Sequence, residues 1–344
     1  MSTTALNLSA VISPGQLSLA NLPKEPRAAG WSRLKVLACG ICGTDLHLLH
    51  GMKMPAGADY PVHPGHEVAA LVIEADPGCG PPPGSAVVVH PLLPCGTCAD
   101  CTSGREHYCM FGEMLGVHRA GGLAEEMLWP SDRLVPIGDL DPNLAALLPD
   151  AVATAYHALQ RANVPRGGKL AVIGSGGVGT NVLQIGRALD PDLETIAVVH
   201  SDGTARRVRD LGFPVVQGLD GAGRSLRKQF GEMDAVIDFS GAEMAASEGV
   251  RMLRKGGRLV LGAVRDEKLS IATPYTGLMT REIEIVGSYS NSLGDLKAVT
   301  ELVLSGKLSL EGLVTHTFPL KDIEKAFDVL EKRPPGMVRV VITG

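Results

Sequence analysis

One glycine-rich segment constrains the fold of this chain more than any other feature. Residues 174–179 have the sequence Gly-Ser-Gly-Gly-Val-Gly and directly follow the apolar run Lys169–Ile173. Apolar side chains then recur at helical spacing as far as Leu189. A strand that turns through glycines into a helix opens a βαβ unit, so this segment predicts a parallel sheet with helices packed on it.

The same alternation of short apolar runs and helical patterns continues beyond Pro149. Strands are expected over residues 169–173, 195–199, 234–238 and 258–261, helices over 178–189, 204–211 and 242–253, and a turn at Gly256–Gly257. Parallel strands joined by helices form right-handed crossovers. We therefore expect an α/β fold with a Rossmann domain, a doubly wound parallel sheet, over residues 150–288.

The glycines of the turn also predict a ligand. Gly174 permits a tight turn, Gly176 lets the backbone approach a pyrophosphate, and Gly179 lets the helix pack closely on the strand. The helix N-terminus offers free N–H groups and the positive end of its dipole to phosphates. A turn that binds nothing is the alternative, which the strand–turn–helix context disfavours. The residues expected to bind NAD(P) here are Gly174, Gly176, Gly177, Val178 and Gly179.

The end of the second strand bears on the choice between NAD and NADP. An NAD site carries an acidic residue about twenty residues further on, which accepts from the ribose hydroxyls. Val199 occupies that position, and His200 and Ser201 follow it. No carboxylate then repels a 2′-phosphate, and His200, Ser201 and Arg206 are donors for it, which favours NADP. Alternatively, these are ordinary solvated positions and Asp202 serves NAD in a shifted register.

The first third of the chain has a different character. It is rich in glycine and proline, with short β-type runs at Arg33–Ala38, Val68–Glu74 and Ala86–Val89, and it predicts an irregular β domain. Beyond Ser288 the pattern loosens, with a helix expected over 293–304, a strand over 315–318, a helix over 321–330 and a strand over 337–342. We expect two domains, residues 1–149 with 289–344, and residues 150–288.

Four cysteines lie close together, at Cys95, Cys98, Cys101 and Cys109. Tetrahedral zinc takes four such thiolates and then has no position left for substrate, so the metal would fold a lobe and take no part in catalysis. We predict a structural zinc in a lobe spanning about residues 90–112. An iron–sulfur cluster would also accept four thiolates, and a disulfide pair is the third alternative.

Charge and hydropathy exclude other classes. The net charge is −5 with both signs mixed along the chain, whereas a nucleic-acid or anionic-membrane surface needs clustered Lys and Arg. No apolar stretch is long enough to span a bilayer. Residues Met1–Ala10 lack the basic head and apolar core of a secretory signal. We therefore expect a cytoplasmic protein whose cysteines are metal ligands or free thiols.

Two further motifs carry a family resemblance. Residues 39–47, Cys-Gly-Ile-Cys-Gly-Thr-Asp-Leu-His, are followed by Gly-His-Glu at 65–67. With the four-cysteine segment and the glycine-rich turn in the same order, the chain resembles the zinc-containing alcohol dehydrogenases of the medium-chain dehydrogenase/reductase family over nearly its whole length. The resemblance implies a GroES-like catalytic domain beside the Rossmann domain. Two departures, Ser85 and Ala120 at positions where the family has acids, weaken assignment to a named subfamily.

The same resemblance implies a catalytic zinc. Its ligands would be Cys42, His66 and a third residue four positions before a threonine at the start of the cofactor domain. Asp150 lies four residues before Thr154, so we expect Asp150 to be that ligand instead of a helix cap. Glu67 would be an outer or transient fourth ligand.

The resemblance assigns roles to several neighbours. Asp45 would hold the imidazole ligand through its other ring nitrogen. Thr44 and His47 would relay the substrate proton to solvent, the alternatives being a turn residue and a solvated helix position. Arg339 would reach the cofactor pyrophosphate, unless it is an ordinary charge at a strand edge. Cys39 is expected to be a small buried residue, although a redox pair with the cysteine ligand is an alternative.

These features predict a zinc-dependent, NAD(P)-linked dehydrogenase that passes a hydride between an alcohol and its carbonyl partner. A zinc with three protein ligands keeps a fourth position for the substrate oxygen and favours the alkoxide. A polyol or sugar dehydrogenase with the same chemistry is one alternative; a non-catalytic zinc- and nucleotide-binding sensor is another. We expect one catalytic and one structural zinc per chain, a small-molecule substrate, no nucleic-acid or membrane partner, and a homodimer or homotetramer.

Overall fold

The computed structural model describes residues 6–265 and 267–344, and the chain divides into two compact units. One unit comprises the residues up to Asp150 together with Ser292–Gly344, and the other comprises Ala151–Asn291. The boundaries expected from the sequence, after residues 149 and 288, lie one and three residues before the observed ones. The expectation of no secretory signal rests partly on residues 1–5, which lie outside the described residues.

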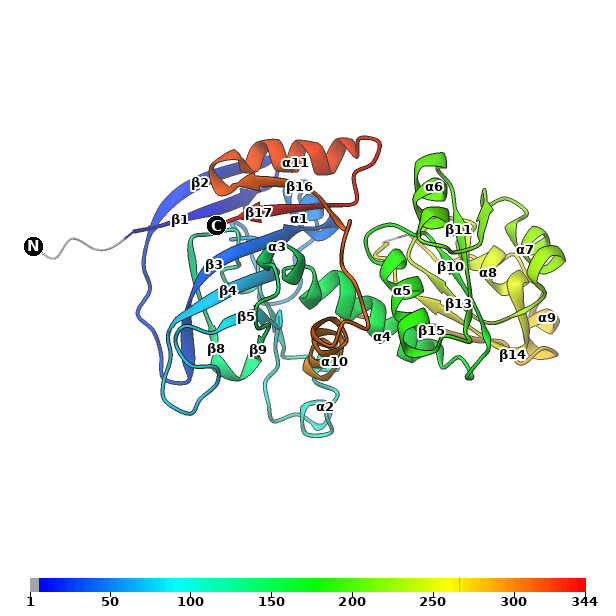
Figure 1. Ribbon diagram of the computed structural model, residues 1–344, viewed down its shortest axis with the longest axis horizontal. Helices are drawn as coiled ribbons and strands as arrows, with labels where there is room; N and C mark the ends of the chain where they lie inside the picture. The colour runs from blue at the N-terminus through cyan, green and yellow to red at the C-terminus, as the bar shows by residue number, and fades with distance from the viewer. Residues whose placement is uncertain (1–5, 266) are drawn as a thin grey trace, which may run out of the picture. The chain divides into compact units, whose positions relative to one another are not determined.

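The unit Ala151–Asn291 is built around a six-stranded sheet (Figure 1). Its strands are β10 (Lys169–Ile173), β11 (Glu194–Val199), β12 (Val215–Gln217), β13 (Met233–Asp238), β14 (Leu253–Leu261) and β15 (Glu284–Gly287). The order is β12-β11-β10-β13-β14-β15, and every neighbouring pair is parallel. The chain therefore reverses its direction of growth between β10 and β13, which is the doubly wound arrangement and confirms the predicted Rossmann fold.

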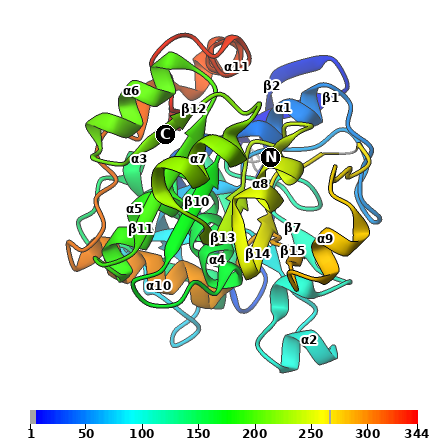
Figure 2. The same ribbon diagram turned by 90° about the vertical axis from the view of Figure 1, so that its right-hand side faces the viewer.

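Helices cover both faces of this parallel sheet (Figures 1 and 2). They are α4 (Ala153–Ala162), α5 (Gly179–Leu189), α6 (Asp202–Asp210), α7 (Ala222–Phe230), α8 (Ala245–Met252) and α9 (Tyr275–Met279). Helix α4 packs on α5, and α7 packs on α8. Because both faces are covered, β10 and β11 are buried along almost their whole length. The glycine pair expected as a turn lies inside β14, where Gly256 has φ +68° beside a shift in strand register.

The other unit is built around a largely antiparallel sheet. Its strands are β3 (Trp31–Ile41), β4 (Glu67–Glu74), β5 (Ala86–Val89), β8 (Glu126–Pro130), β9 (Leu134–Pro136), β16 (Val314–Pro319) and β17 (Arg339–Thr343). The order is β16-β17-β3-β4-β5-β9, and β8 also pairs with β3. The end of the chain thus returns to the N-terminal strands through β17, which pairs antiparallel with β3. This arrangement confirms the predicted β domain.

Smaller elements complete this unit. An antiparallel hairpin, which the sequence did not predict, joins β1 (Leu6–Ser13) and β2 (Gln16–Pro23), and β6 (Leu92–Leu93) pairs with β7 (Glu113–Met114). The helices are α1 (Gly43–Leu49), α2 (Ala99–Thr102), α3 (Pro142–Ala145), α10 (Leu293–Leu304) and α11 (Ile323–Lys332), with 3-10 turns at Glu106–Tyr108, Ser131–Arg133 and Leu320–Asp322. A π-helix, Leu148–Val152, precedes α4.

Each unit has its own hydrophobic core. In the β unit, Trp129 is fully buried and packs edge-on against Trp31, with ring centroids 6.2 Å apart. Its indole N–H donates to the His90 carbonyl at 2.9 Å, so its one polar atom is satisfied. In the α/β unit, the core is formed by the strands and the inner faces of α7 and α8. Among the described residues, none of the helices is long and apolar enough to cross a membrane.

Candidate active site

Three segments of the β unit bring the expected ligands of the catalytic zinc together. Cys42 follows β3 as the N-cap of α1, and His66 directly precedes β4. Asp150 lies within the π-helix Leu148–Val152, a rare conformation that frequently marks functional sites. The N-cap of α4 is Val152, so the structure does not use Asp150 as the cap of that helix.

The ligand atoms have the spacing of a tetrahedral metal site. The ligand atoms of Cys42, His66, Glu67 and Asp150 all lie within 4.8 Å of one another. Cys42 Sγ is 3.2 Å from His66 Nε2, which is 3.7 Å from Asp150 Oδ2. Ligands bound tetrahedrally at zinc distances lie about 3.3–3.6 Å apart. These side chains therefore fit one zinc ion.

The electrostatics of this cluster favour a cation. Burial raises the pKa of the Cys42 thiol, and the charge of His66 opposes the rise. Burial also raises the pKa of Glu67 to about 7, against the opposing charge of Arg339. For Asp150, burial acts in the same direction, but the hydrogen bond and the charge of His66, together with smaller contributions from other neighbours, outweigh it and leave the pKa below its usual range. A thiolate and two carboxylates crowded in one buried cluster are unfavourable alone, and a divalent ion offsets that cost.

Glu67 forms an ion pair that sequence analysis missed. Both of its carboxylate oxygens accept from Arg339 Nη2, and both side chains are buried. Arg339 begins β17 and Glu67 begins β4, with β3 between them. A Cβ at Gly40 of β3 would lie 3.0 Å from the Glu67 Cβ, so the absence of a side chain there lets Glu67 cross β3.

This pair changes the expected role of Arg339. The resemblance predicted a contact with the cofactor pyrophosphate, whereas the structure gives the guanidinium a carboxylate partner beside the expected zinc ligands. Arg339 therefore balances the negative charge of Glu67 in this cluster, and a pyrophosphate contact stays a prediction. The pair depends on the strand order β17-β3-β4, which no local sequence pattern reveals.

The expected contact between Asp45 and His66 is not made. Asp45 is the third residue of α1, and its Oδ2 accepts from the backbone N–H of Cys42 at 2.9 Å, while the Cys42 side chain accepts from the backbone in return. Asp45 Oδ1 and His66 Nδ1 are both buried without a hydrogen-bond partner among the described residues. The Asp45 carboxylate is engaged in this reciprocal helix cap, so Asp45 positions the Cys42 backbone instead of the His66 imidazole.

The two residues expected to relay a proton lie on α1. The Thr44 backbone N–H donates to Cys42 Sγ at 3.2 Å, which places this residue beside the metal ligands. His47 lies one helical turn further on and is exposed to solvent. Residues three apart share a helix face, so the spacing suits a relay whose function stays a prediction. Cys39 is a fully buried free thiol outside the ligand cluster, as expected for a packing residue.

The four-cysteine segment forms a second ligand cluster. All four Sγ atoms lie within 4.8 Å of one another, with separations of 3.4 Å for Cys98–Cys101, 3.8 Å for Cys95–Cys101 and 3.9 Å for Cys98–Cys109. Four sulfurs on one zinc lie about 3.8 Å apart. The cysteines are free, so the disulfide alternative is wrong. Backbone hydrogen bonds from Thr97 and Cys98 lower the pKa of Cys95 to about 6, which favours the thiolate that a metal needs.

The glycine-rich turn has the geometry expected of a dinucleotide site. Gly174 has φ +86°, and a Cβ there would lie 2.6 Å from the Ser240 backbone nitrogen. A Cβ at Gly179 would meet the Gly174 carbonyl oxygen, whereas Gly176 faces open space. The turn follows β10, at the point where the strand order reverses, which is where open parallel sheets bind ligands. Gly177 and Val178 complete the turn before α5.

The residues expected to bind the 2′-phosphate lie at and just beyond the end of β11, at the surface of the α/β unit. His200, Ser201 and Arg206 are all exposed. The Ser201 hydroxyl accepts from the Thr204 backbone N–H at 3.3 Å and caps α6. The Asp202 carboxylate accepts a hydrogen bond from the Gln217 side chain. The carboxylate that would bind the ribose hydroxyls of NAD in the alternative register therefore already has a partner. A phosphate-binding role for His200, Ser201 and Arg206 stays a prediction.

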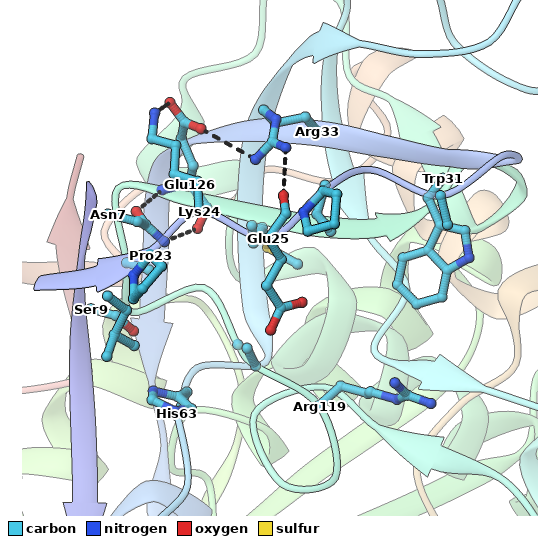
Figure 3. A pocket seen from close by; sticks show the side chains of 18 residues that line it. Asn7, Ser9, Pro23, Lys24, Glu25, Trp31, Arg33, His63, Arg119 and Glu126 are labelled. Atoms are coloured by element: carbon cyan, nitrogen blue, oxygen red, sulfur yellow. Dashed lines mark hydrogen bonds and ion pairs between the residues drawn. The ribbon is translucent and has the colours of Figure 1, made fainter. Parts of the chain in front are cut away.

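A separate pocket of the β unit lies between the β1–β2 hairpin and the segment around Arg119 (Figure 3). Two of its charged residues are already paired, Lys24 with Glu126 at 2.6 Å and Arg119 with Glu113 at 2.6 Å. None of the expected zinc ligands lines it. The pocket therefore offers no group for hydride transfer.

Comparison with known proteins agrees with this geometry. The family model described as the alcohol dehydrogenase GroES-like domain matches residues 28–139, and the zinc-binding dehydrogenase model matches residues 177–305. D-altritol 5-dehydrogenase of Agrobacterium fabrum is 30% identical, covering 95% of this chain and 96% of that protein. The chain belongs to the zinc-containing medium-chain dehydrogenase/reductase family. It is an NAD(P)-linked oxidoreductase that acts on CH–OH donors.

Two further relatives of this dehydrogenase are informative. L-galactonate-5-dehydrogenase of Escherichia coli is 29% identical, covering 90% of this chain and 91% of that protein. The structure of an alcohol dehydrogenase from Pyrobaculum aerophilum, solved with cobalt and zinc bound, superposes with a TM-score of 0.84 at 26% identity, covering 98% and 99% of the two chains. The family resemblance and the fold expected from the sequence are thus confirmed.

The two ligand clusters predict a metal content that can be measured. Cys42→Ala and Cys98→Ala should each reduce the zinc content from two ions to one per chain, because each removes a ligand from a different cluster. Cys98→Ala should also lower the thermal midpoint, since its zinc folds the lobe. The control is Cys79→Ala, an exposed thiol outside both clusters. Elemental analysis that found the same zinc content in all three variants would contradict the assignment.

Proposed function

We propose that this chain is a zinc-dependent dehydrogenase of polyols or sugar-type substrates. The observation that carries the proposal is the tetrahedral spacing of Cys42 Sγ, His66 Nε2 and Asp150 Oδ2. The names of the altritol and galactonate dehydrogenases place their oxidised hydroxyl on a polyhydroxylated carbon chain. Their similarity to this chain favours such a substrate over a simple alcohol. A non-catalytic sensor would be expected to lose a ligand, and all three are present.

The three ligands define what the metal centre contributes. When bound, the zinc supplies a Lewis acid for the substrate's alcohol oxygen, and NAD(P) accepts the hydride. Cys42 and Asp150 contribute two negative charges and His66 a neutral imidazole, which together offset the charge of the ion. Glu67 also lies in the cluster, but its charge is balanced by the ion pair with Arg339. Three ligands then leave the fourth position for the substrate.

The proton of the alcohol has a short route to solvent along α1. Thr44 lies beside Cys42 Sγ, and its hydroxyl can both accept and donate a proton. His47, one turn further along the helix, is exposed and can pass a proton from one ring nitrogen to the other. We infer that these two residues carry the proton from the largely buried cluster to solvent.

The cofactor would bind with its pyrophosphate at the glycine-rich turn and the N-terminus of α5. The open space at Gly176 leaves room for phosphate oxygens next to the backbone. At the end of β11, Val199 is buried and supplies no carboxylate, and Asp202 is engaged by Gln217. We infer that NADP is accepted, with His200, Ser201 and Arg206 as donors to the 2′-phosphate.

The substrate class is tested by steady-state kinetics with the zinc-loaded protein. Altritol, arabinitol and galactonate are compared with ethanol, 2-propanol and benzyl alcohol, each with NAD and with NADP. We expect kcat/KM for the best polyhydroxylated substrate to exceed that for every simple alcohol by about tenfold or more, because a site built for extra hydroxyls rejects analogues that lack them. A preference for simple alcohols would favour the alternative of an ordinary alcohol dehydrogenase.

Asp150→Asn tests the third zinc ligand. Turnover should fall by about a hundredfold or more, since even outer partners of metal ligands change activity by 10–100-fold. The dissociation constant of NADPH should stay within about twofold, because the glycine-rich turn is untouched. The matched control is Asp139→Asn, an exposed carboxylate of the same segment that contacts neither cluster. Unchanged turnover in Asp150→Asn would remove Asp150 from the site.

Val199→Asp tests the choice of cofactor. A carboxylate at the end of β11 should repel the 2′-phosphate and accept from the ribose hydroxyls, so the ratio of kcat/KM for NADP over NAD should fall by about tenfold or more. Val199→Asn, which has the same shape without the charge, is the control. If the ratio of kcat/KM for NADP over NAD is the same in both variants and in the wild type, the end of β11 does not contact the adenosine ribose.

A further inference from the structure

One cation beside the glycine-rich turn has no role in the account above. Arg207 lies on α6, and its Nη2 donates to the Ser175 carbonyl oxygen at 2.6 Å and to Thr180 Oγ1 at 3.3 Å. Ser175 is the second residue of the turn, and Thr180 is the second residue of α5. The guanidinium therefore joins α6 to the turn and to the start of the helix behind it.

This contact fixes the direction of a peptide group. The Thr180 hydroxyl also donates to the Ser175 carbonyl oxygen, at 3.0 Å, so two side chains hold that oxygen. In a trans peptide the C=O and the following N–H point in opposite directions. Holding the Ser175 carbonyl toward Arg207 therefore directs the Gly176 N–H away from Arg207. Gly176 is the residue at which the structure leaves open space.

The charge of Arg207 is not balanced nearby. The two oxygens that accept from its guanidinium belong to a backbone carbonyl and a hydroxyl, which are neutral, and its Nε is buried without a hydrogen-bond partner among the described residues. Burial lowers the pKa of Arg207, whereas its helix neighbours Arg206 and Arg209 are exposed. A half-buried cation without a counter-ion is costly, and an anion bound at the adjacent turn would offset that cost.

We propose that Arg207 is a positioning residue for the cofactor pyrophosphate, which it serves by orienting the Gly176 peptide and by placing an uncompensated positive charge behind the turn. This inference rests on the proposed binding of NAD(P) at residues 174–179. The positive charge of Arg207 would stabilise the pyrophosphate and not the 2′-phosphate, because the guanidinium contacts the glycine-rich turn itself.

The test measures the binding of charged and uncharged ligands to the zinc-loaded protein. NADH and NADPH are titrated by fluorescence, and ADP and adenosine compete with NADH. Arg207→Met should weaken NADH, NADPH and ADP alike by about tenfold, because it removes both the positive charge behind the turn and the hydrogen bond that orients the Gly176 peptide. Adenosine, which has no phosphate, should change by less than about twofold. Arg209→Met, an exposed arginine of the same helix, should change none of the four.

Arg207→Lys guards against a folding defect in the methionine variant. Lysine keeps the charge but not the planar fork, so the affinity for ADP should fall less than in Arg207→Met and adenosine should again be unaffected. An equal loss for adenosine and ADP, a loss confined to NADPH, or no loss at all would overturn the inference. A wild-type protein that bound neither NADH nor NADPH would instead refute the proposed function, and this inference with it.

Discussion

The structure depends on a thiolate, an imidazole and a carboxylate that come within ligand distance of one another in a largely buried cluster. Burial raises the pKa of Cys42 and Glu67, so the anionic forms that bind metal are unfavourable when the cluster stands alone. A divalent ion changes this balance because it pairs with the charges at once. The contacts around Cys42, His66 and Asp150 are best understood as the surroundings of such an ion.

The sheet of the β unit explains why distant residues converge there. Strand β3 lies between β4 and β17, so Glu67 and Arg339 are separated by 272 positions in sequence but meet across Gly40. The cap of α1 then positions Cys42 through Asp45. In the α/β unit, a comparable set of local contacts from Arg207 and Thr180 holds the glycine-rich turn. In both sites a side chain holds a backbone group in place, and in the β unit the Glu67–Arg339 ion pair adds a contact between side chains.

Sequence alone predicted the features that local spacing determines. The glycine-rich turn and the four cysteines each occupy fewer than twenty consecutive residues, and the chain geometry over such a length leaves few alternatives. The Glu67–Arg339 pair could not be predicted, because it depends on strand order. The Asp45–His66 contact was wrong because a local helix cap competes for the same carboxylate. The hairpin of β1 and β2 was missed although its sequence carries the usual signals, since apolar and polar residues alternate over Gln16–Leu19 and Pro14–Gly15 marks the turn.

The central claim is that one metal ion is held by Cys42, His66 and Asp150. Anomalous diffraction at the zinc absorption edge, from crystals of the zinc-loaded protein, tests it most directly. The account predicts two peaks per chain, one within the four-cysteine lobe and one surrounded by Cys42 Sγ, His66 Nε2 and a carboxylate oxygen of Asp150. A single peak in the cysteine lobe, with no density between Cys42 and His66, would contradict it.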